Sequence, residues 1–384
     1  MKFLHTSDLH IGKKLDGITR LDEQREVLGE IVSIAREREV DAVIISGDVF
    51  DTFVPSAEAE AAFYDFAAEL SDKKRAVIVI SGNHDDEDRL FASGVLALKN
   101  GIFFCGRDNA FPKMQVGNVK IIDSGRYFIE LSDGKENIRL GTVPYFSDAP
   151  KGEIVDKDED YGDRAKRIFS EALGSGDECK ILVAHFFMLG GVPTNGERAV
   201  DLGGARVIAP SAIPEDCKYA ALGHLHRRQV AIKARNIIYS GSPMQYSYDE
   251  AGTEKSVTIF ETDGKEVKNI EIVPIKKGKR LVEISCLGIE NADEAVGRYA
   301  DDYVSLTIRS DRPLALEETK GLKERFPNIT QIKLVVTKMT ADGRIIGRKH
   351  LSDEELFKGY FEARYGAPPE DDVMQTYLEI MSEE

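Results

Sequence analysis

Apolar and polar positions alternate along the first hundred residues with two different periods. The runs KFLHTS (2–7), DAVIIS (41–46) and RAVIVI (75–80) are short, apolar and rich in β-branched residues, which is typical of buried strands. Between them, residues 21–39 and 56–70 repeat apolar side chains at helical spacing. The order strand, helix, strand, helix, strand predicts a parallel sheet at the core of an α/β fold.

The rest of the chain follows other patterns. After Gly101, short strands separated by turn signals favour antiparallel pairing. A helix is expected over residues 163–173, ahead of a buried strand that ends in ILVAH (181–185). Residues 293–299 and 316–326 predict helices between the strands of a small α+β unit.

These changes of pattern divide the chain into domains. We expect a first domain over residues 1–275, a basic linker at IKKGKR (275–280), an α+β domain over 280–340 and a helical tail over 345–384. The two amphipathic patterns of the tail cover residues 352–365 and 370–381. The apolar face of the first one either packs on its own chain or docks a partner.

Composition adds constraints on location and partners. The chain has 384 residues and a formal net charge of −16, so DNA binding would need local positive charge, a bound metal or a basic partner. No apolar stretch approaches the ~18 residues of a membrane span, and Asp8 and His10 interrupt the N-terminal apolar run before a signal sequence forms. The four cysteines form no C-x-x-C pair, and we interpret them as reduced thiols of a cytoplasmic protein.

Several apolar strands deliver polar side chains at or just past their carboxyl ends, where open α/β sheets gather their ligand sites. The segments are DLH (8–10), GD (47–48), GNHD (82–85), His185 and GHLH (223–226). A single histidine at a strand end is more often structural than a ligand, and D-x-H or GD alone is a weak signal. However, five of the seven histidines fall in these segments, which predicts a metal site. His5 and His350 remain outside it as structural or surface residues.

The donor types indicate which metals such a site would suit. Carboxylates, imidazoles and one amide form a mixed oxygen and nitrogen set that suits Mn²⁺, Fe or Zn²⁺ better than Ca²⁺ or Mg²⁺. Asp8 and His10 are two positions apart, as are His224 and His226, so in extended backbone each pair points to one side. This number of ligands exceeds one tetrahedral site and furnishes two metals that share a bridging carboxylate.

The motifs resemble those of the calcineurin-like metallophosphoesterase superfamily, which are D-x-H, GD, GNH, a lone H and GHxH. A closer resemblance, to the SbcD family of nuclease subunits, is carried by HTSDLHIGK (5–13), SGDVFDT (46–52), SGNHD (81–85), LGHLH (222–226) and YSGSPMQYS (239–247). The resemblance implies a four-layer α/β/β/α sandwich with two mixed sheets, a small α+β capping domain and a C-terminal helical tail.

Carried over position by position, the resemblance implies two divalent cations, with Mn²⁺ as the ion. One would be held by Asp8, His10, Asp48 and His226, and the other by Asp48, Asn83, His185 and His224, with Asp48 as the bridge. One position departs from the family pattern, because this chain has Asp51 where archaeal relatives have a histidine and purple acid phosphatases a tyrosine. The departure argues against a tyrosinate-bound Fe(III), and Asp51 either assists the substrate or orients a neighbour.

Charge divides the roles of Asn83 and His84. Two divalent cations bring about four positive charges, and Asp8, Asp48 and a bridging hydroxide remove about three, which leaves a surplus that suits a phosphodiester. A carboxylate in place of Asn83 would cancel this surplus. The metals would supply hydroxide for in-line attack on phosphorus. His84, beside a ligand but not coordinating, is expected to assist the leaving group as a general acid or to stabilise the transition state.

Other polar residues have auxiliary roles in this interpretation. Asp51 and Asp85 are candidates to orient His84. The candidate contacts to the DNA backbone are Lys13, Lys14, Arg89, Arg227 and Arg228. For any one of these cations, a solvated or ion-paired surface role is the more common case.

The resemblance implies a metal-dependent DNA nuclease subunit, with 3′–5′ exonuclease activity on duplex ends and endonuclease activity on hairpins or single strands, in DNA end processing and repair. Its implied partners are DNA, an SbcC-like SMC-family ATPase bound through the C-terminal helices, and a second copy of the chain within a heterotetramer, in the cytoplasm or at the nucleoid. The alternatives are a phosphatase or cyclic-nucleotide phosphodiesterase with the same dimetal site, and a non-catalytic scaffold for the ATPase. The segments beyond Lys276 favour the nuclease, and the complete ligand set argues against the scaffold.

Overall fold

The computed structural model describes residues 1–147, 159–194 and 206–336, and beyond them the short pieces 338–339, 345–346, 357–358, 361, 369 and 373–374. The chain forms two compact units, Met1–Glu283 with Asp301–Val304, and Ile284–Ala300 with Ser305–Glu384. The helices expected in the tail lie outside the described residues apart from these short pieces, and His350 lies outside them as well. None of the described helices is long and apolar enough to cross a membrane.

The first unit contains a six-stranded mixed sheet in the order β16-β15-β1-β4-β5-β6. Its strands are β1 (Lys2–Thr6), β4 (Ala42–Ser46), β5 (Ala76–Ile80), β6 (Ile102–Phe104), β15 (Ser256–Thr262) and β16 (Val267–Pro274). Strands β1, β4 and β5 run parallel, as the sequence predicts. Strand β6 also pairs parallel with β5, although antiparallel pairing is expected after Gly101, and β15 and β16 pair antiparallel. Helices α1 (Leu21–Glu37) and α2 (Ala57–Ser71) pack on this sheet.

A second sheet of the same unit has eight strands in the order β13-β14-β12-β11-β10-β9-β8-β7. They are β7 (Met114–Val116), β8 (Val119–Gly125), β9 (Phe128–Ser132), β10 (Asn137–Val143), β11 (Cys179–His185), β12 (Cys217–Gly223), β13 (Gln229–Ile232) and β14 (Ile237–Tyr239). The neighbours β10, β11, β12 and β14 are parallel, whereas the strands toward both edges are antiparallel. Helix α5 (Tyr161–Leu173) packs on this sheet.

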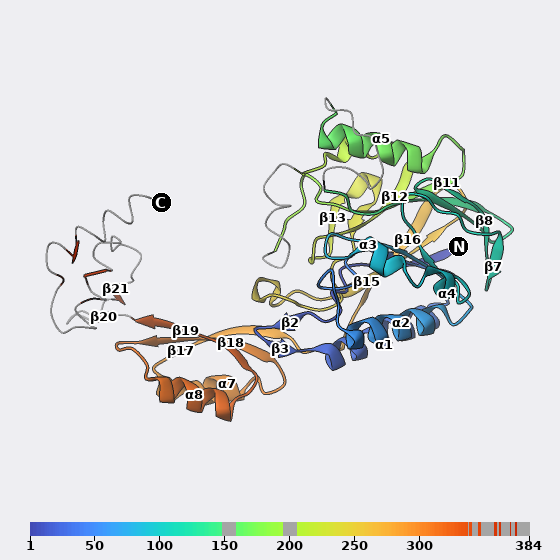
Figure 1. Cartoon of the computed structure of the whole chain (residues 1–384). Coiled ribbons are helices and arrows are strands. Elements are labelled where there is room, and N and C mark those ends of the chain that lie inside the picture. Colours follow the sequence, from blue (N-terminus) through green and yellow to red (C-terminus); the bar gives the residue numbers. More distant parts are fainter. Residues whose placement is uncertain are drawn as a thin grey trace. The chain divides into compact units, whose positions relative to one another are not determined.

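The two-residue period of the strands sorts their apolar side chains into three layers of core. In β4, Val43 and Ile45 belong to the cluster with α1 and α2, whereas Ile44 belongs to the cluster between the two sheets. In β11, Val183 joins the same central cluster, and Leu182 joins the cluster with α5. Figure 1 shows α1 and α2 on one side of the sheets and α5 on the other. The expected α/β/β/α sandwich with two mixed sheets is confirmed.

The expected helices of this unit agree with the structure to within two residues. Helix α2 begins one residue later than expected because Ser56 is its N-cap, and the Ser56 side chain accepts a hydrogen bond from Ala59 N at 3.2 Å. The remaining short elements are β2 (Lys14–Leu15), β3 (Ile18–Thr19), α3 (Glu87–Phe91), α4 (Gly94–Leu98) and the 3₁₀ turns Pro210–Ala212, Lys233–Arg235 and Tyr248–Glu250.

The second unit is built around a three-stranded sheet in the order β17-β18-β19. Its elements are β17 (Leu281–Leu287), a 3₁₀ turn (Ile289–Asn291), α7 (Ala292–Gly297), β18 (Tyr303–Ser310), α8 (Leu316–Arg325) and β19 (Ile329–Val336), followed by β20 (Lys338–Met339) and β21 (Ile345–Ile346). Val296, Leu306 and Leu322 are fully buried, and Arg325 pairs with Asp293 at 2.8 Å. The two helices expected here are present, whereas a capping role for this unit stays a prediction.

Candidate metal centre

The carboxyl ends of strands from both sheets gather the predicted ligands in one place. From the six-stranded sheet, β1 leads to Asp8 and His10, β4 to Asp48, and β5 to Asn83; from the eight-stranded sheet, β11 ends at His185 and β12 leads to His224 and His226. All of these side chains are buried, with exposed fractions of 4% or less. The backbone N–H of His224 donates to Asp8 Oδ1 at 2.9 Å, which ties the two sheets together at the site.

The ligand atoms fall into two overlapping groups around Asp48. In one group, His10 Nε2 lies 3.0 Å from His226 Nε2 and 3.5 Å from Asp48 Oδ2. Two sets of three residues each offer ligand atoms within 4.8 Å of one another: Asp8, His10 and His226 in one set, and Asp8, Asp48 and His185 in the other. Asp48 therefore lies between a group around His10 and a group around His185, where a bridging carboxylate would be.

The second group is centred on Asn83. Its Oδ1 atom lies 2.9 Å from His185 Nε2 and 3.1 Å from His224 Nδ1. His185 Nε2 also lies 3.4 Å from Asp48 Oδ2. The other ring nitrogen of His185, Nδ1, faces the carbonyl oxygen of Ser46 at 2.8 Å, and because a carbonyl only accepts, Nδ1 carries the proton. Nε2 of His185 is therefore the ring atom that faces Asp48 and Asn83 and is available to coordinate.

The backbone is unusual at the same residues. Asp8, His10 and Asp48 have φ values of 53°, 42° and 50°, and His224 has a φ of 103°. Residues other than glycine rarely adopt a positive φ, and such backbone strain concentrates at functional sites. Gly82 shows how closely the loops approach, because a Cβ atom at this position would lie 2.2 Å from Asp48 Oδ1.

His84 lies beside the ligands, and its ring is held by a hydrogen bond to the main chain of Asp51. Its Nδ1 atom donates to the carbonyl oxygen of Asp51 at 2.8 Å, and its backbone N–H donates to Asp48 Oδ1 at 2.8 Å. The His84 and His10 rings meet edge to face with centroids 4.7 Å apart. One ligand atom each of His84, His10 and Asp48 also lie within 4.8 Å of one another. Because Nδ1 is engaged with a carbonyl, Nε2 is the ring atom that remains for chemistry.

The structure gives Asp51 and Asp85 different surroundings. Asp51 Oδ1 lies 2.7 Å from Lys13 Nζ and 3.5 Å from His10 Nδ1. Burial opposes ionisation of Asp51, but His10 and Lys13 outweigh it and hold its pKa below the ordinary value. The Asp85 carboxylate accepts hydrogen bonds from the backbone N–H groups of Val49, Phe50 and Gly82, so it joins the loops after β4 and β5. Burial, together with the charge of Asp48, raises the pKa of Asp85 to about 7.

The candidate DNA-contacting cations differ in their partners. Lys13 and Arg89 each lie 2.7 to 2.8 Å from a carboxylate oxygen, and Arg227 donates to a main-chain carbonyl. Lys14 is exposed on β2, and Arg228 is partly exposed. Of this set, Lys14 and Arg89 are exposed, and Arg89 is paired with Glu60.

The donor set fits divalent cations. Burial lowers the pKa of His10 to about 3 and that of His224 well below its usual value, so both rings are neutral and able to coordinate. Burial disfavours a charge on His185 as well, but Asp48 outweighs it and raises the His185 pKa to about 9 in the metal-free chain. Within the site, His10 Nε2 and His226 Nε2 face each other at 3.0 Å, as expected of two ligand atoms that would share a cation.

Sequence reasoning missed Glu250, which lies directly behind His226. Its side chain is fully buried, and its Oε1 atom lies 3.4 Å from His226 Nδ1. Its other oxygen contacts Lys255 Nζ. The only signal in the sequence was the S-x-x-E spacing from Ser247 to Glu250, which indicates the start of a helix rather than a functional site.

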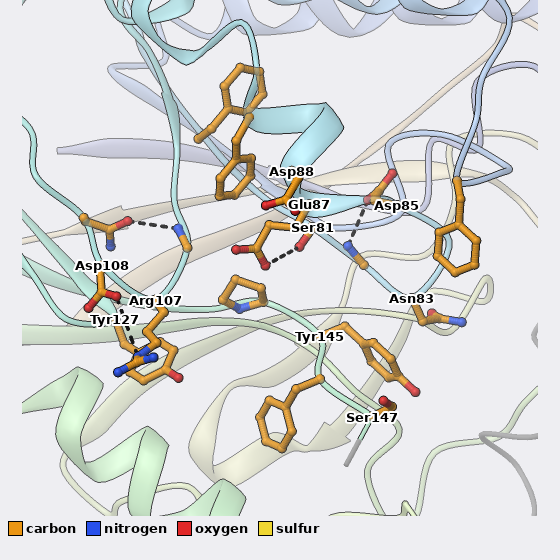
Figure 2. Close-up of a pocket in the computed structure, with 18 of the residues that line it drawn as sticks. Ser81, Asn83, Asp85, Glu87, Asp88, Arg107, Asp108, Tyr127, Tyr145 and Ser147 are labelled. Carbon is orange, nitrogen blue, oxygen red and sulfur yellow. Dashed lines mark hydrogen bonds and ion pairs between the residues drawn. The ribbon is translucent and has the colours of Figure 1, made fainter. Parts of the chain in front are cut away.

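A cavity of about 770 Å³ opens beside Asn83 (Figure 2). Much of its wall is aromatic, from Phe53, Phe91, Phe104, Phe111, Tyr127, Tyr145 and Phe146. Figure 2 shows Asn83 toward one end of the cavity and Arg107 with Asp108 toward the other. Its volume lies within the usual range of ligand pockets, and aromatic walls suit flat rings such as nucleobases.

Comparisons with known proteins place the chain in one family. The family model described as calcineurin-like phosphoesterase matches residues 1–228. The D subunit of nuclease SbcCD from Bacillus subtilis (strain 168) is 35% identical over 399 residues, which cover 100% of this chain and 98% of that protein. The protein of the same name from Rhodobacter capsulatus is 28% identical over 340 residues, covering 82% of each chain.

Two further likenesses are weaker. The D subunit of nuclease SbcCD from Staphylococcus epidermidis is 24% identical over 374 residues, covering 94% of this chain and 93% of that protein. Among solved structures, TT1561 of Thermus thermophilus matches 67% of this chain and 92% of its own at 13% identity. Its TM-score of 0.36 is too low to support an argument.

Proposed function

The chain belongs to the calcineurin-like phosphoesterase family and, within it, to the SbcD subunits, and from this premise we propose that it cleaves DNA as the nuclease subunit of an end-processing complex. It is a metal-dependent phosphodiesterase of the nuclease type. The observation that carries the proposal is the buried convergence of ligand atoms around Asp48 from the strand ends of two sheets. With two divalent cations bound, the neutral amide of Asn83 would leave this set a net positive charge, which suits an anionic phosphodiester.

The proposed ligand sets share Asp48. Asp8, His10, Asp48 and His226 would hold one divalent cation, and Asp48, Asn83, His185 and His224 the other, with Mn²⁺ as the ion. When bound, two such cations activate water as a nucleophile and stabilise charge on the phosphoryl oxygens. The distances of 2.9 to 3.5 Å between donor atoms within each group support this division.

The chain's own residues position the substrate and move the proton. His84 donates from Nδ1 to the Asp51 carbonyl, so its Nε2 is directed to the site and would protonate the leaving oxygen. The neutral side chain of Asn83 avoids a third carboxylate, which would repel the phosphodiester. Asp51 acts on His84 through its main chain and lies beside His10 through its side chain, which supports an orienting role.

Two features support DNA rather than a small phosphate ester as the substrate. The aromatic cavity beside Asn83 is large enough for a nucleotide of a strand whose phosphate lies at the metal centre, and stacking on aromatic rings contributes about 1–3 kcal/mol per base. The chain also carries a second compact unit and a tail, for which a small-molecule phosphatase has no evident use. We propose 3′–5′ exonuclease activity on duplex ends and endonuclease activity on hairpins or single strands.

The proposed assembly contains an SbcC-like SMC-family ATPase, bound through the C-terminal helices, and two copies of this chain, in the cytoplasm or at the nucleoid. The three relatives are each named as one subunit of a nuclease called SbcCD, which supports a second kind of subunit as partner. The net charge of −16 also favours a partner, because an acidic chain gains little from non-specific attraction to phosphates.

One comparison of substrates tests the proposal. The chain with Mn²⁺ is assayed on linear duplex DNA, hairpin DNA and p-nitrophenyl phosphate, with and without the ATPase. We expect cleavage of both DNA substrates, stimulated by the ATPase, and loss of that stimulation in a chain that ends at Arg348. Turnover of the small ester without cleavage of any DNA under all conditions would refute the nuclease and favour the phosphatase.

A further inference from the structure

A buried ion pair lies behind the metal centre, outside the residues assigned to the reaction. Glu250 is fully buried and Lys255 is 9% exposed, and Lys255 Nζ contacts Glu250 Oε2. Burying two charges is costly and by itself is weak evidence of a stabilising role. The position of this pair therefore calls for a reason other than stability.

Both members of the pair contact His226. The Oε1 atom of Glu250 lies 3.4 Å from His226 Nδ1, and Lys255 Nζ donates to the carbonyl oxygen of His226 at 2.8 Å. Lys255 Nζ also donates to Ser242 Oγ at 2.9 Å. The pair therefore holds His226 by its ring on one side and by its main chain on the other.

The carboxylate determines which ring nitrogen of His226 is protonated. A carboxylate only accepts hydrogen bonds, so the ring atom that faces Glu250, Nδ1, carries the proton. The opposite atom, Nε2, then presents its lone pair toward His10 Nε2, 3.0 Å away. Carboxylates behind metal-binding histidines have this effect on tautomer and ring orientation in other metal sites.

Helix capping explains only part of these contacts. Glu250 accepts from Ser247 N at 3.0 Å and from Tyr246 N at 3.1 Å, and the first contact belongs to a capping box around a single 3₁₀ turn. A cap needs neither a buried lysine nor a contact with a histidine 24 residues away. His185 shows the contrast, because a neutral carbonyl of Ser46 holds its Nδ1 atom.

We propose that Glu250 and Lys255 are a positioning pair for His226, which fixes its tautomer and aims its Nε2 atom at one of the two cations. The inference rests on the metal centre of the proposed function. Neither residue touches the substrate, so their effect is on the occupancy of one cation site.

Titration of the metal-free protein with Mn²⁺, followed by calorimetry and by the electron paramagnetic resonance of free Mn²⁺, tests this role. The wild-type chain should bind two ions. Glu250→Gln should weaken one of the two sites roughly 10- to 100-fold and leave the other within about twofold. Glu254→Gln is the matched control, because Glu254 is exposed on the same loop.

A second variant covers the case in which Glu250→Gln fails to fold with an unpaired Lys255. The double variant Glu250→Gln/Lys255→Met removes both charges and should fold with a thermal midpoint close to wild type while showing the same weakened site. In the metal-free wild type, ¹⁵N chemical shifts should show His226 protonated at Nδ1, and in the double variant a mixture of tautomers.

The outcomes separate this inference from the function on which it rests. Wild-type protein that binds no Mn²⁺ would overturn the metal centre itself. Two ions bound by the wild type and by both variants with the same affinities would overturn the positioning pair alone. Equal weakening of both sites, together with a lower thermal midpoint, would also overturn it, because that result indicates a general structural role.

Discussion

Replacing Gly82 by alanine tests how tightly the loops are packed at the metal centre. A Cβ atom at position 82 would lie 2.2 Å from Asp48 Oδ1 and 2.3 Å from Asp48 N, whereas an ordinary contact starts at 3.4 Å. The loops must therefore separate by about 1.2 Å, which is 3.4 minus 2.2. The Asp48 backbone cannot yield easily, because it has a φ of 50° and its carbonyl accepts from His10 N at 3.0 Å.

The expected loss follows from this displacement. A misplacement of about 1 Å in a catalytic constellation costs on the order of 100-fold in rate, or about 3 kcal/mol of transition-state stabilisation. Overpacking adds a loss of about 1–3 kcal/mol in the free energy of unfolding. We therefore expect Gly82→Ala to lower kcat/KM on DNA by roughly two orders of magnitude, with weaker binding of Mn²⁺.

Gly94→Ala is the control, since no atom lies within 4 Å of the Cβ position at Gly94, in helix α4. The measurements are kcat/KM on a duplex DNA end, Mn²⁺ affinity by calorimetry and unfolding by urea. Gly94→Ala should match the wild type in kcat/KM and Mn²⁺ affinity and should be at least as stable to urea, because alanine is the better helix former. Wild-type activity and metal affinity in Gly82→Ala would refute the close approach of the two loops.

Two further predictions concern histidines. His84→Ala should bind two Mn²⁺ ions, by elemental analysis, and lose roughly 10²- to 10⁴-fold in nuclease rate, and loss of an ion from this variant would contradict its non-coordinating role. Burial lowers the pKa of His5 to about 3, so below pH 6.5 the unfolded chain takes up a proton that the folded chain does not, and stability falls as pH falls. At pH 5 the loss in the free energy of unfolding is about 2 kcal/mol. Urea unfolding in EDTA should therefore show a smaller drop in this free energy between pH 7 and pH 5 for His5→Gln than for the wild type. Equal drops in the two proteins would contradict the prediction.

The sequence determined the elements and the donor types of the site. Continuous β-branched runs and helical periods located the strands and helices of the first unit, because burial on both faces of a strand and on one face of a helix leaves distinct local periods. The glycines and polar residues after β1, β4, β5, β11 and β12 indicated the site, since parallel strands end at a common edge. Those patterns are local, so each can be read from a few neighbouring residues.

The tertiary structure decided which groups face each ligand. Asp8 meets the backbone of His224 across 216 residues of sequence, and His185 meets Asn83 across 102. Glu250 lies behind His226 rather than in solvent. The Asp85 carboxylate accepts from three backbone N–H groups, and the described residues show no contact between it and the His84 ring. Such pairings depend on how two sheets stack and on left-handed backbone at the ligands. Long-range packing, which leaves no local period in a sequence, sets both.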